Sequence, residues 1–218
     1  MIYSIIYKLI FNYYIKMDVR KQLVIPGSFE LYCGPMKSGK SAALLYRIDK
    51  IKHNKIEFIT IKPKIDTRNN HIHSRFSDLT FDCTIVDEQK PEEIFNYIKN
   101  EKAVIIDEIM FFNDKIVNVV KELLRDKLSV IAAGLDTNFR GEPFGPMPYL
   151  LCIADYVEKL EGTCEYKNCK NLANRTQRLI NGQPAHYNDP LITIEGKNEN
   201  ETYECRCLEH HFVPGRPY

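Results

Sequence analysis

The sequence lacks an excess of charge of either sign, and it lacks a long apolar run. Its 218 residues include 30 basic and 29 acidic side chains, which gives a formal net charge of +1. A chain balanced in this way has no overall field that would favour nucleic acid or a membrane surface as its main partner. No window approaches the roughly 20 apolar residues that cross a bilayer. We therefore expect neither nucleic acid nor a membrane among its partners.

A signal-peptide pattern is also missing. Residues 1–16 are apolar and aromatic but carry Lys8 and Lys16, and no small-residue cleavage site follows them. We expect residues 1–22 to be a disordered or dispensable extension, with a membrane anchor as the alternative. Seven cysteines without a secretory pattern indicate a reducing compartment. We therefore expect a cytoplasmic protein whose clustered cysteines bind metal rather than form disulfides.

Residues 34–41 match the phosphate-binding pattern G-x-x-x-x-G-K-[ST] at every required position. An apolar strand is expected before them at 29–33 and a helix after them at 42–51, which is the context that the pattern requires. Glycines let backbone N–H groups point at phosphate oxygens, and the helix N-terminus adds its positive dipole end. Lys40 would reach the terminal phosphates and Ser41 would bind Mg²⁺. The predicted nucleoside triphosphate site consists of Gly34, Pro35, Met36, Lys37, Ser38, Gly39, Lys40 and Ser41.

Two acidic residues, Asp107 and Glu108, directly follow the apolar run at 103–106. Such a run predicts a strand that is buried on both faces. In open parallel sheets, ligands bind outside the carboxyl ends of the strands. In proteins with a phosphate loop, an aspartate at this place completes the Mg²⁺ site. We therefore predict that Asp107 joins Ser41 in binding Mg²⁺.

Strands and helices alternate from Leu31 to Ala133. Further strands are expected at 56–61, 81–86 and 128–133, helices at 92–99 and 116–125, and a loop without periodicity at 69–77. The alternation implies a parallel sheet with helices on both faces. The predicted fold class is α/β, a RecA-like sheet with a phosphate loop, in a nucleotide-binding domain at 23–159.

After about Lys159 the periodic patterns fade, and cysteines and short turns dominate. Cys164 and Cys169 supply one pair of thiols, while Cys205, Cys207, His210 and His211 compete to supply a second pair. Two ligand pairs about forty residues apart are typical of a structural zinc site, and a segment this poor in apolar residues needs metal to fold. We expect a small zinc-binding lobe at 160–218. The alternative is a set of unrelated free thiols.

These motifs, in this order, resemble the cellular (type II) thymidine kinases. The resemblance covers residues 23–218 and is closest in the run GLDTNFRGEPFGPMP at 134–148. It extends to Asp66-Thr67-Arg68, Thr176-Gln177-Arg178-Leu179 and the closing residues 213–218. The resemblance implies transfer of the ATP γ-phosphate to the 5′-hydroxyl of deoxythymidine. It also implies a homotetramer.

The resemblance assigns individual residues as well. Glu108 matches the general base and Arg68 a charged residue near the phosphates. A flexible lasso around 192–196 is implied to close over the base. The positions that enclose the nucleoside match Met36, Phe111, Leu135, Phe139, Phe144 and Tyr203. The zinc ligands match Cys164, Cys169, Cys207 and His210, and the two residues between the last pair permit a tight turn that points both at one ion.

Two positions depart from the family pattern. Met110 stands where the family commonly has glutamine, and Lys37 stands in the phosphate loop where phenylalanine is typical. One alternative function is a RecA-like, zinc-containing ATPase that acts on nucleic acid, against which stands the lack of a basic stripe. Another is a non-catalytic nucleotide sensor, motivated by Met110. For the kinase, we expect zinc loss to raise the thymidine KM before it affects ATP binding.

Overall fold

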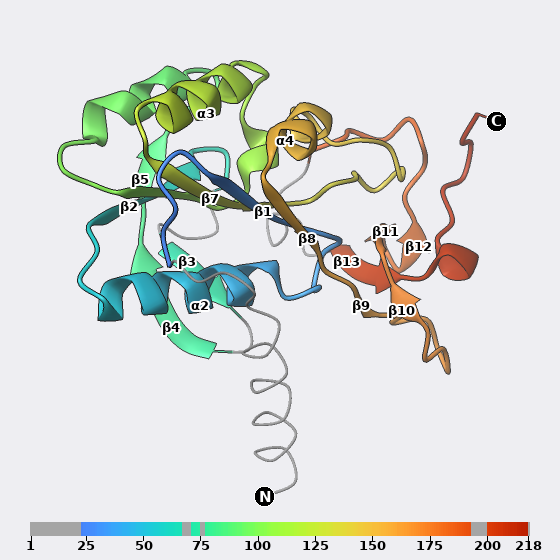
Figure 1. Ribbon diagram of the computed structural model, residues 1–218. Coiled ribbons are helices and arrows are strands. Elements are labelled where there is room, and N and C mark those ends of the chain that lie inside the picture. Colours follow the sequence, from blue (N-terminus) through green and yellow to red (C-terminus); the bar gives the residue numbers. More distant parts are fainter. Residues whose placement is uncertain (1–22, 67–70, 75–76, 193–199, 218) are drawn as a thin grey trace, which may run out of the picture.

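The computed structural model is built around a six-stranded parallel sheet of order β5-β2-β6-β7-β1-β8 (Figure 1). The structure describes residues 23–66, 71–74, 77–192 and 200–217, so the expected extension at 1–22 lies outside the described residues. Every neighbouring pair in this sheet is parallel. The predicted α/β fold class is therefore confirmed. The strands are β1 (Phe29–Cys33), β2 (Phe58–Pro63), β5 (Thr84–Val86), β6 (Ala103–Ile106), β7 (Ser129–Gly134) and β8 (Tyr156–Lys159).

Both faces of the sheet are covered, which explains why its strands are apolar along their whole length. Figure 1 shows helix α2 (Lys40–His53) on one face, and α3 (Lys115–Arg125) and α4 (Met147–Ile153) on the other. On β6, Val104 and Ile106 lie in the core on the α3 side, whereas Ile105 lies in the core on the α2 side. Alternate side chains of one strand thus support two separate cores.

Each covering helix buries an apolar stripe with helical spacing. In α2 the buried apolar residues are Leu44, Leu45, Ile48 and Ile51. In α3 they are Ile116, Val117, Val119, Val120 and Leu123. Side chains three or four residues apart share one helix face, so these stripes pack onto the sheet. The expected helices at 42–51 and 116–125 are confirmed within two residues at each end.

The described part of the expected loop at 69–77, residues 71–74 and 77, is strand instead, so the loop prediction was wrong there. Strand β3 (His71–Ser74) pairs antiparallel with β4 (Ser77–Asp82). Fully buried Ile72 lies opposite Phe81, and both belong to the core that α2 covers. One strand was expected at 81–86, but the chain divides there into β4 and β5. A short hairpin stabilised by packing against a helix leaves little periodicity to detect in sequence.

The chain after β8 forms a separate group of short antiparallel strands, shown in orange and red in Figure 1. Strand β11 (Arg175–Ile180) lies between β12 (Gln183–Pro184) and β13 (Glu201–Arg206). Strand β9 (Gly162–Thr163) pairs with β10 (Leu172–Ala173), and the 3-10 helix η3 (Leu208–His210) follows β13. Among the described residues, no helix combines the length and the apolarity needed to cross a membrane.

The described residues include two further 3-10 helices. Segment η1 (Pro91–Tyr97) takes the place of the α-helix expected at 92–99, and η2 (Ile109–Phe111) directly follows the acidic pair after β6. Pro91 fixes the start of η1. Only Pro91 and Ile94 of η1 are buried, so this segment packs on the core through a single helical turn.

Candidate active site

The phosphate loop, residues 34–41, joins β1 to α2 and folds as the motif requires. Gly34 has φ +141°, and a Cβ there would lie 2.2 Å from the backbone oxygen of Leu160. Only glycine therefore fits between this loop and the end of β8. Ser38 Oγ is buried and has no hydrogen-bond partner within the described part of the chain. A buried hydroxyl in this position can donate to a phosphate oxygen.

Lys40, the first residue of α2, is buried beneath the loop. Its Nζ donates to the backbone oxygen of Pro35, 2.7 Å away. Burial lowers the pKa of Lys40, and the nearby carboxylates of Glu108 and Asp107 oppose that effect. A buried ammonium gains most from a further anion, because burial has removed its water. The site is thus built to receive negative charge from a ligand.

Asp107 and Glu108 lie at the carboxyl end of β6, which is separated from β1 by β7 alone. Both side chains are buried, and the Glu108 N–H donates to Asp107 Oδ1 at 3.0 Å. Glu108 has φ +52° and ψ +40°, in the left-handed region that non-glycine residues rarely adopt. Backbone strain of this kind occurs mainly at functional sites. Because the strands are parallel, this pair lies at the same sheet edge as the phosphate loop.

The residues predicted to enclose a nucleoside divide into three places. Met36, Phe111, Leu135 and Phe144 belong to one apolar cluster, in which the rings of Phe111 and Phe144 meet edge to face at 5.6 Å. Phe139 instead packs with Ala185 and Val213, and the Arg178 guanidinium lies 5.4 Å from its ring. Tyr203 lies on β13, opposite Arg178 of β11. Arg68 and lasso residues 193–196 lie outside the described residues.

Met110 has a structural role that the sequence did not reveal. Its side chain is 2% exposed, and its sulfur accepts a hydrogen bond from the Leu135 N–H at 3.4 Å. A Cβ on Gly134 would lie 3.3 Å from the same sulfur. Met110 therefore packs under the end of β7, where it supports Leu135.

Four predicted metal ligands come together in the C-terminal lobe. The ligand atoms of Cys164, Cys169, Cys207 and His210 all lie within 4.8 Å of one another. The His210 Nδ1 is 3.1 Å from Cys207 Sγ and 3.8 Å from Cys164 Sγ, and the sulfurs of Cys169 and Cys207 are 4.0 Å apart. With Zn–S near 2.3 Å and Zn–N near 2.0 Å, a tetrahedral zinc separates its ligand atoms by about 3.5–3.8 Å. The donor set and its spacing fit zinc.

The two competing ligands contact backbone oxygens instead. Cys205 Sγ contacts the backbone oxygen of Ala173 at 3.5 Å, and His211 Nε2 lies 2.9 Å from the backbone oxygen of Phe139. Beside the cluster, the His210 ring stacks on Tyr166 with centroids 4.1 Å apart. The Cys205 and His211 side chains are therefore not among the four that come together, although Cys205 packs beside Cys164 and Cys207.

Three contacts near the site escaped sequence reasoning. Buried Asp136, just after β7, pairs with Lys159 at 2.7 Å. The Thr176 hydroxyl of β11 accepts the Met36 N–H at 3.0 Å. Glu165 pairs with Lys37 at 2.8 Å. Asp136 lies in the run at 134–148 and Thr176 begins the Thr-Gln-Arg-Leu motif, so the sequence could have indicated both. Nothing in the sequence links residues 37 and 165.

Comparison with known proteins places most of this chain within one family. The model of the thymidine kinase family matches residues 27–211. A thymidine kinase from Coprothermobacter proteolyticus is 46% identical over 194 residues, which cover 87% of this chain and 93% of that protein. The solved flagellar accessory protein FlaH from Methanocaldococcus jannaschii has a TM-score of 0.46 at 13% identity, and covers 72% of this chain and 81% of its own. Domain III of the replication initiation protein DnaA from Thermotoga maritima has a TM-score of 0.41 at 15% identity, and covers 69% of this chain and 61% of its own.

Proposed function

This chain belongs to the thymidine kinase family, and we propose that it transfers the γ-phosphate of ATP to the 5′-hydroxyl of deoxythymidine, with Glu108 as general base. Membership makes it an ATP-dependent kinase. The observation that supports the specific mechanism is the carboxylate pair Asp107 and Glu108, which is buried at the sheet edge and close enough to Lys40 to influence its pKa, with Glu108 in a strained backbone conformation. The family match does not favour a nucleic-acid ATPase.

In the proposed reaction, this chain positions charge rather than forming a covalent intermediate. The backbone N–H groups of residues 34–41 and the Lys40 ammonium would hold the terminal phosphates. Glu108 would accept the proton of the 5′-hydroxyl as its oxygen attacks the γ-phosphorus. The bond between that phosphorus and the β,γ-bridging oxygen breaks, and ADP leaves with the electron pair. A well-placed base of this kind contributes about 10²–10⁴-fold.

Two metals are part of the proposal. Ser41 and Asp107 would hold Mg²⁺, since a hydroxyl and a carboxylate at this sheet edge are oxygen donors of the kind it prefers. When bound, Mg²⁺ neutralises charge on the phosphates. Cys164, Cys169, Cys207 and His210 would hold a structural zinc in a lobe at 160–218, distinct from the nucleotide-binding domain at 23–159. Four protein ligands leave no open position, so zinc supplies a cross-link and no chemistry.

The proposed slot for thymine is apolar. Phe111, Phe144, Leu135 and Met36 share one cluster, and a slot of this kind accepts a pyrimidine that carries a methyl group. Phe139 and Tyr203 would close the nucleoside site from the C-terminal side, and Arg68 would lie near the phosphates. A single methyl group in an apolar slot is worth about 1–3 kcal/mol, so deoxyuridine should be accepted less well but not rejected.

Incubation with Mg-ATP and each deoxynucleoside in turn tests this function. We expect deoxythymidine monophosphate as the main product, less deoxyuridine monophosphate, and no efficient phosphorylation of deoxyadenosine or deoxyguanosine. Efficient purine phosphorylation would contradict the apolar pyrimidine slot. ATP hydrolysis that depends on DNA would indicate the nucleic-acid ATPase instead. Thymidine binding without any turnover would indicate the nucleotide sensor.

We further infer a homotetramer that acts in the cytoplasm on two small-molecule substrates, ATP and thymidine. The support for this inference is the family resemblance. Sedimentation velocity on the purified protein tests the assembly, and a mass of one 25.5 kDa chain at working concentration would contradict it.

A further inference from the structure

The phosphate loop is held from outside by the C-terminal lobe. At the top of the loop, the Met36 N–H donates to Thr176 Oγ1 at 3.0 Å. The next residue, Lys37, places its Nζ 2.8 Å from Glu165 Oε1. Thr176 and Glu165 both belong to the lobe, so two adjacent loop residues are anchored to it. Neither contact involves the residues that would bind Mg²⁺.

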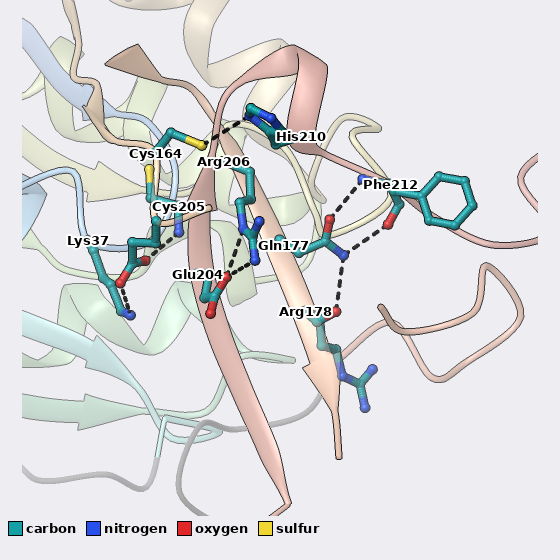
Figure 2. Close-up of polar contacts among 10 residues, drawn as sticks. Lys37, Cys164, Gln177, Arg178, Glu204, Cys205, Arg206, His210 and Phe212 are labelled. Carbon is teal, nitrogen blue, oxygen red and sulfur yellow. Dashed lines mark hydrogen bonds and ion pairs between the residues drawn. The ribbon is translucent and has the colours of Figure 1, made fainter. Parts of the chain in front are cut away.

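Glu165 is fixed by the strand that leads to the metal cluster. Its second carboxylate oxygen accepts the Cys205 N–H at 2.7 Å, and its own N–H donates to the Cys205 backbone oxygen at 2.8 Å. Lys37 and Cys205, which Figure 2 shows close together, both bond to this carboxylate. Glu165 follows Cys164 in the chain, and Cys205 precedes Cys207 by two residues. Two of the three cluster thiols therefore lie on the segments that position this carboxylate.

The anchored part of the loop needs such support. Lys37 has φ +63°, a left-handed conformation that costs a non-glycine residue free energy and persists only where the surroundings enforce it. The lobe also packs tightly here. A Cβ on Gly162 would lie 2.6 Å from Cys205 Sγ and 3.4 Å from the Lys37 backbone oxygen. Contacts with the lobe therefore hold Lys37 on both its side chain and its backbone.

We propose that Glu165 is a positioning residue that couples the metal cluster to the phosphate loop. The folded cluster fixes Glu165, Glu165 fixes Lys37, and the loop keeps the shape in which its N–H groups receive phosphate. This inference rests on the proposed binding of Mg-ATP by the loop. From the sequence we expected zinc loss to impair thymidine binding first and ATP binding later. The coupling predicts instead that zinc loss weakens Mg-ATP binding directly.

Glu165→Gln tests the coupling, because glutamine keeps an oxygen for the Cys205 N–H but removes the charge that pairs with Lys37. If Glu165 acted only through its negative charge, its removal would tighten Mg-ATP binding, because a carboxylate near an anion site is lost. If Glu165 holds the loop in shape, its removal should weaken Mg-ATP binding. We expect the Kd of Mg-ATP to rise about two- to five-fold, the range for a partly exposed ion pair. The thymidine Kd and the zinc content should not change.

Glu92→Gln is the matched control, because Glu92 also pairs with a lysine, Lys115, at 3.6 Å on an exposed surface. It removes the same charge and should leave the Mg-ATP Kd unchanged. In a Lys37→Met background, adding Glu165→Gln should have little further effect. Extraction of zinc with phenanthroline should raise the Mg-ATP Kd more in the wild type than in Glu165→Gln.

Several results would overturn the inference. One is wild-type affinity, or tighter binding, of Mg-ATP by Glu165→Gln. Loss of zinc from that variant would place Glu165 in the metal site instead, and equal effects of zinc extraction on both proteins would remove the coupling. Failure of the wild type itself to bind Mg-ATP would contradict the proposed function as well, so the two failures are distinguishable.

Discussion

At the scale of single residues, burial decides which charged and nucleophilic groups can react. Cys33 directly precedes the phosphate loop and Lys40 lies within it, and burial shifts their pKa values in opposite directions. It lowers the pKa of the Lys40 ammonium and raises the pKa of the Cys33 thiol to about 11, with a contribution from Asp136. In both cases burial favours the neutral form. A bound triphosphate would compensate for the lysine, whereas the nearby Lys159 and Lys40 only partly offset the raised pKa of Cys33.

The thiols should therefore differ in reactivity. At pH 8, iodoacetamide should modify exposed Cys152 before buried Cys33, because a pKa near 11 leaves roughly a thousandth of the Cys33 thiol ionised. As the pH rises toward 11, the Cys33 rate should increase about tenfold per unit. Peptide mass spectrometry of the folded protein follows both sites, with Cys152→Ser as the control. Equal labelling of the two thiols at pH 8 would contradict this account.

The metal ligands allow a prediction by single substitution. Cys207→Ser and His210→Ala each remove an atom from the cluster, so both variants should lose zinc. Cys205→Ser and His211→Ala change neighbours whose side chains contact backbone oxygens instead, so both should retain about one zinc per chain. Elemental analysis of the purified variants decides between the two sets. If the first two variants kept zinc and the second two lost it, Cys205 and His211 would be the ligands instead of Cys207 and His210.

Residues with a local motif could be predicted from the sequence, whereas residues with only a spatial partner could not. Residues 34–41 carry their function in a contiguous pattern, and Asp107 carries it in its place after a strand. From the sequence, Met110 only replaces the glutamine that is common in the family. In the structure its sulfur accepts a hydrogen bond from the N–H of Leu135, 25 positions along the chain. Only the folded chain reveals such a partner.

At the scale of elements, buried strands and amphipathic helices were predictable because their patterns are strong. The strands expected at 29–33 and 103–106 match β1 and β6, since both are continuous apolar runs. The β3–β4 hairpin escaped because its stability comes from Ile72 and Phe81 packing near α2, not from a pattern of its own. Strand β11 escaped for a related reason, since its buried residues include Thr176, Gln177 and Arg178.

Arg178 forms a buried charge pair in the C-terminal sheet. Its guanidinium donates to Glu201 on β13 at 2.5 Å and to the Pro190 backbone oxygen at 2.6 Å. Arg178→Met should destabilise folding by about 3–5 kcal/mol, because the buried Glu201 carboxylate loses the guanidinium that pairs with it. Urea denaturation measures the effect.

The matching double variant distinguishes charge from packing. Arg178→Met combined with Glu201→Leu removes both charges and should recover much of the loss, since apolar replacements of buried pairs are often neutral or stabilising. The double variant could instead lose as much stability as the two single variants together. In that case the hydrogen bond to Pro190 and the packing on Phe139 contribute more to stability than the charge pair does.

At the scale of the whole molecule, the strand order assembles the site. The phosphate loop follows β1 and the acidic pair follows β6, about seventy residues later in the sequence. They meet because β7 pairs with both strands and all three are parallel. The alternation of strands and helices predicts a parallel sheet, but it does not predict which strands are neighbours. That order, and the docking of the lobe on the loop, come only from the folded structure.

Turnover of Glu108→Gln in saturating Mg-ATP and thymidine tests the central claim most directly. If Glu108 accepts the 5′-hydroxyl proton, kcat should fall by about 10²–10⁴-fold while the thymidine Kd stays near the wild-type value. The matched control is Glu122→Gln on the exposed surface of α3, where Glu122 pairs with Arg125, and it should retain full activity. Near wild-type turnover by Glu108→Gln would remove Glu108 from the mechanism and contradict the account.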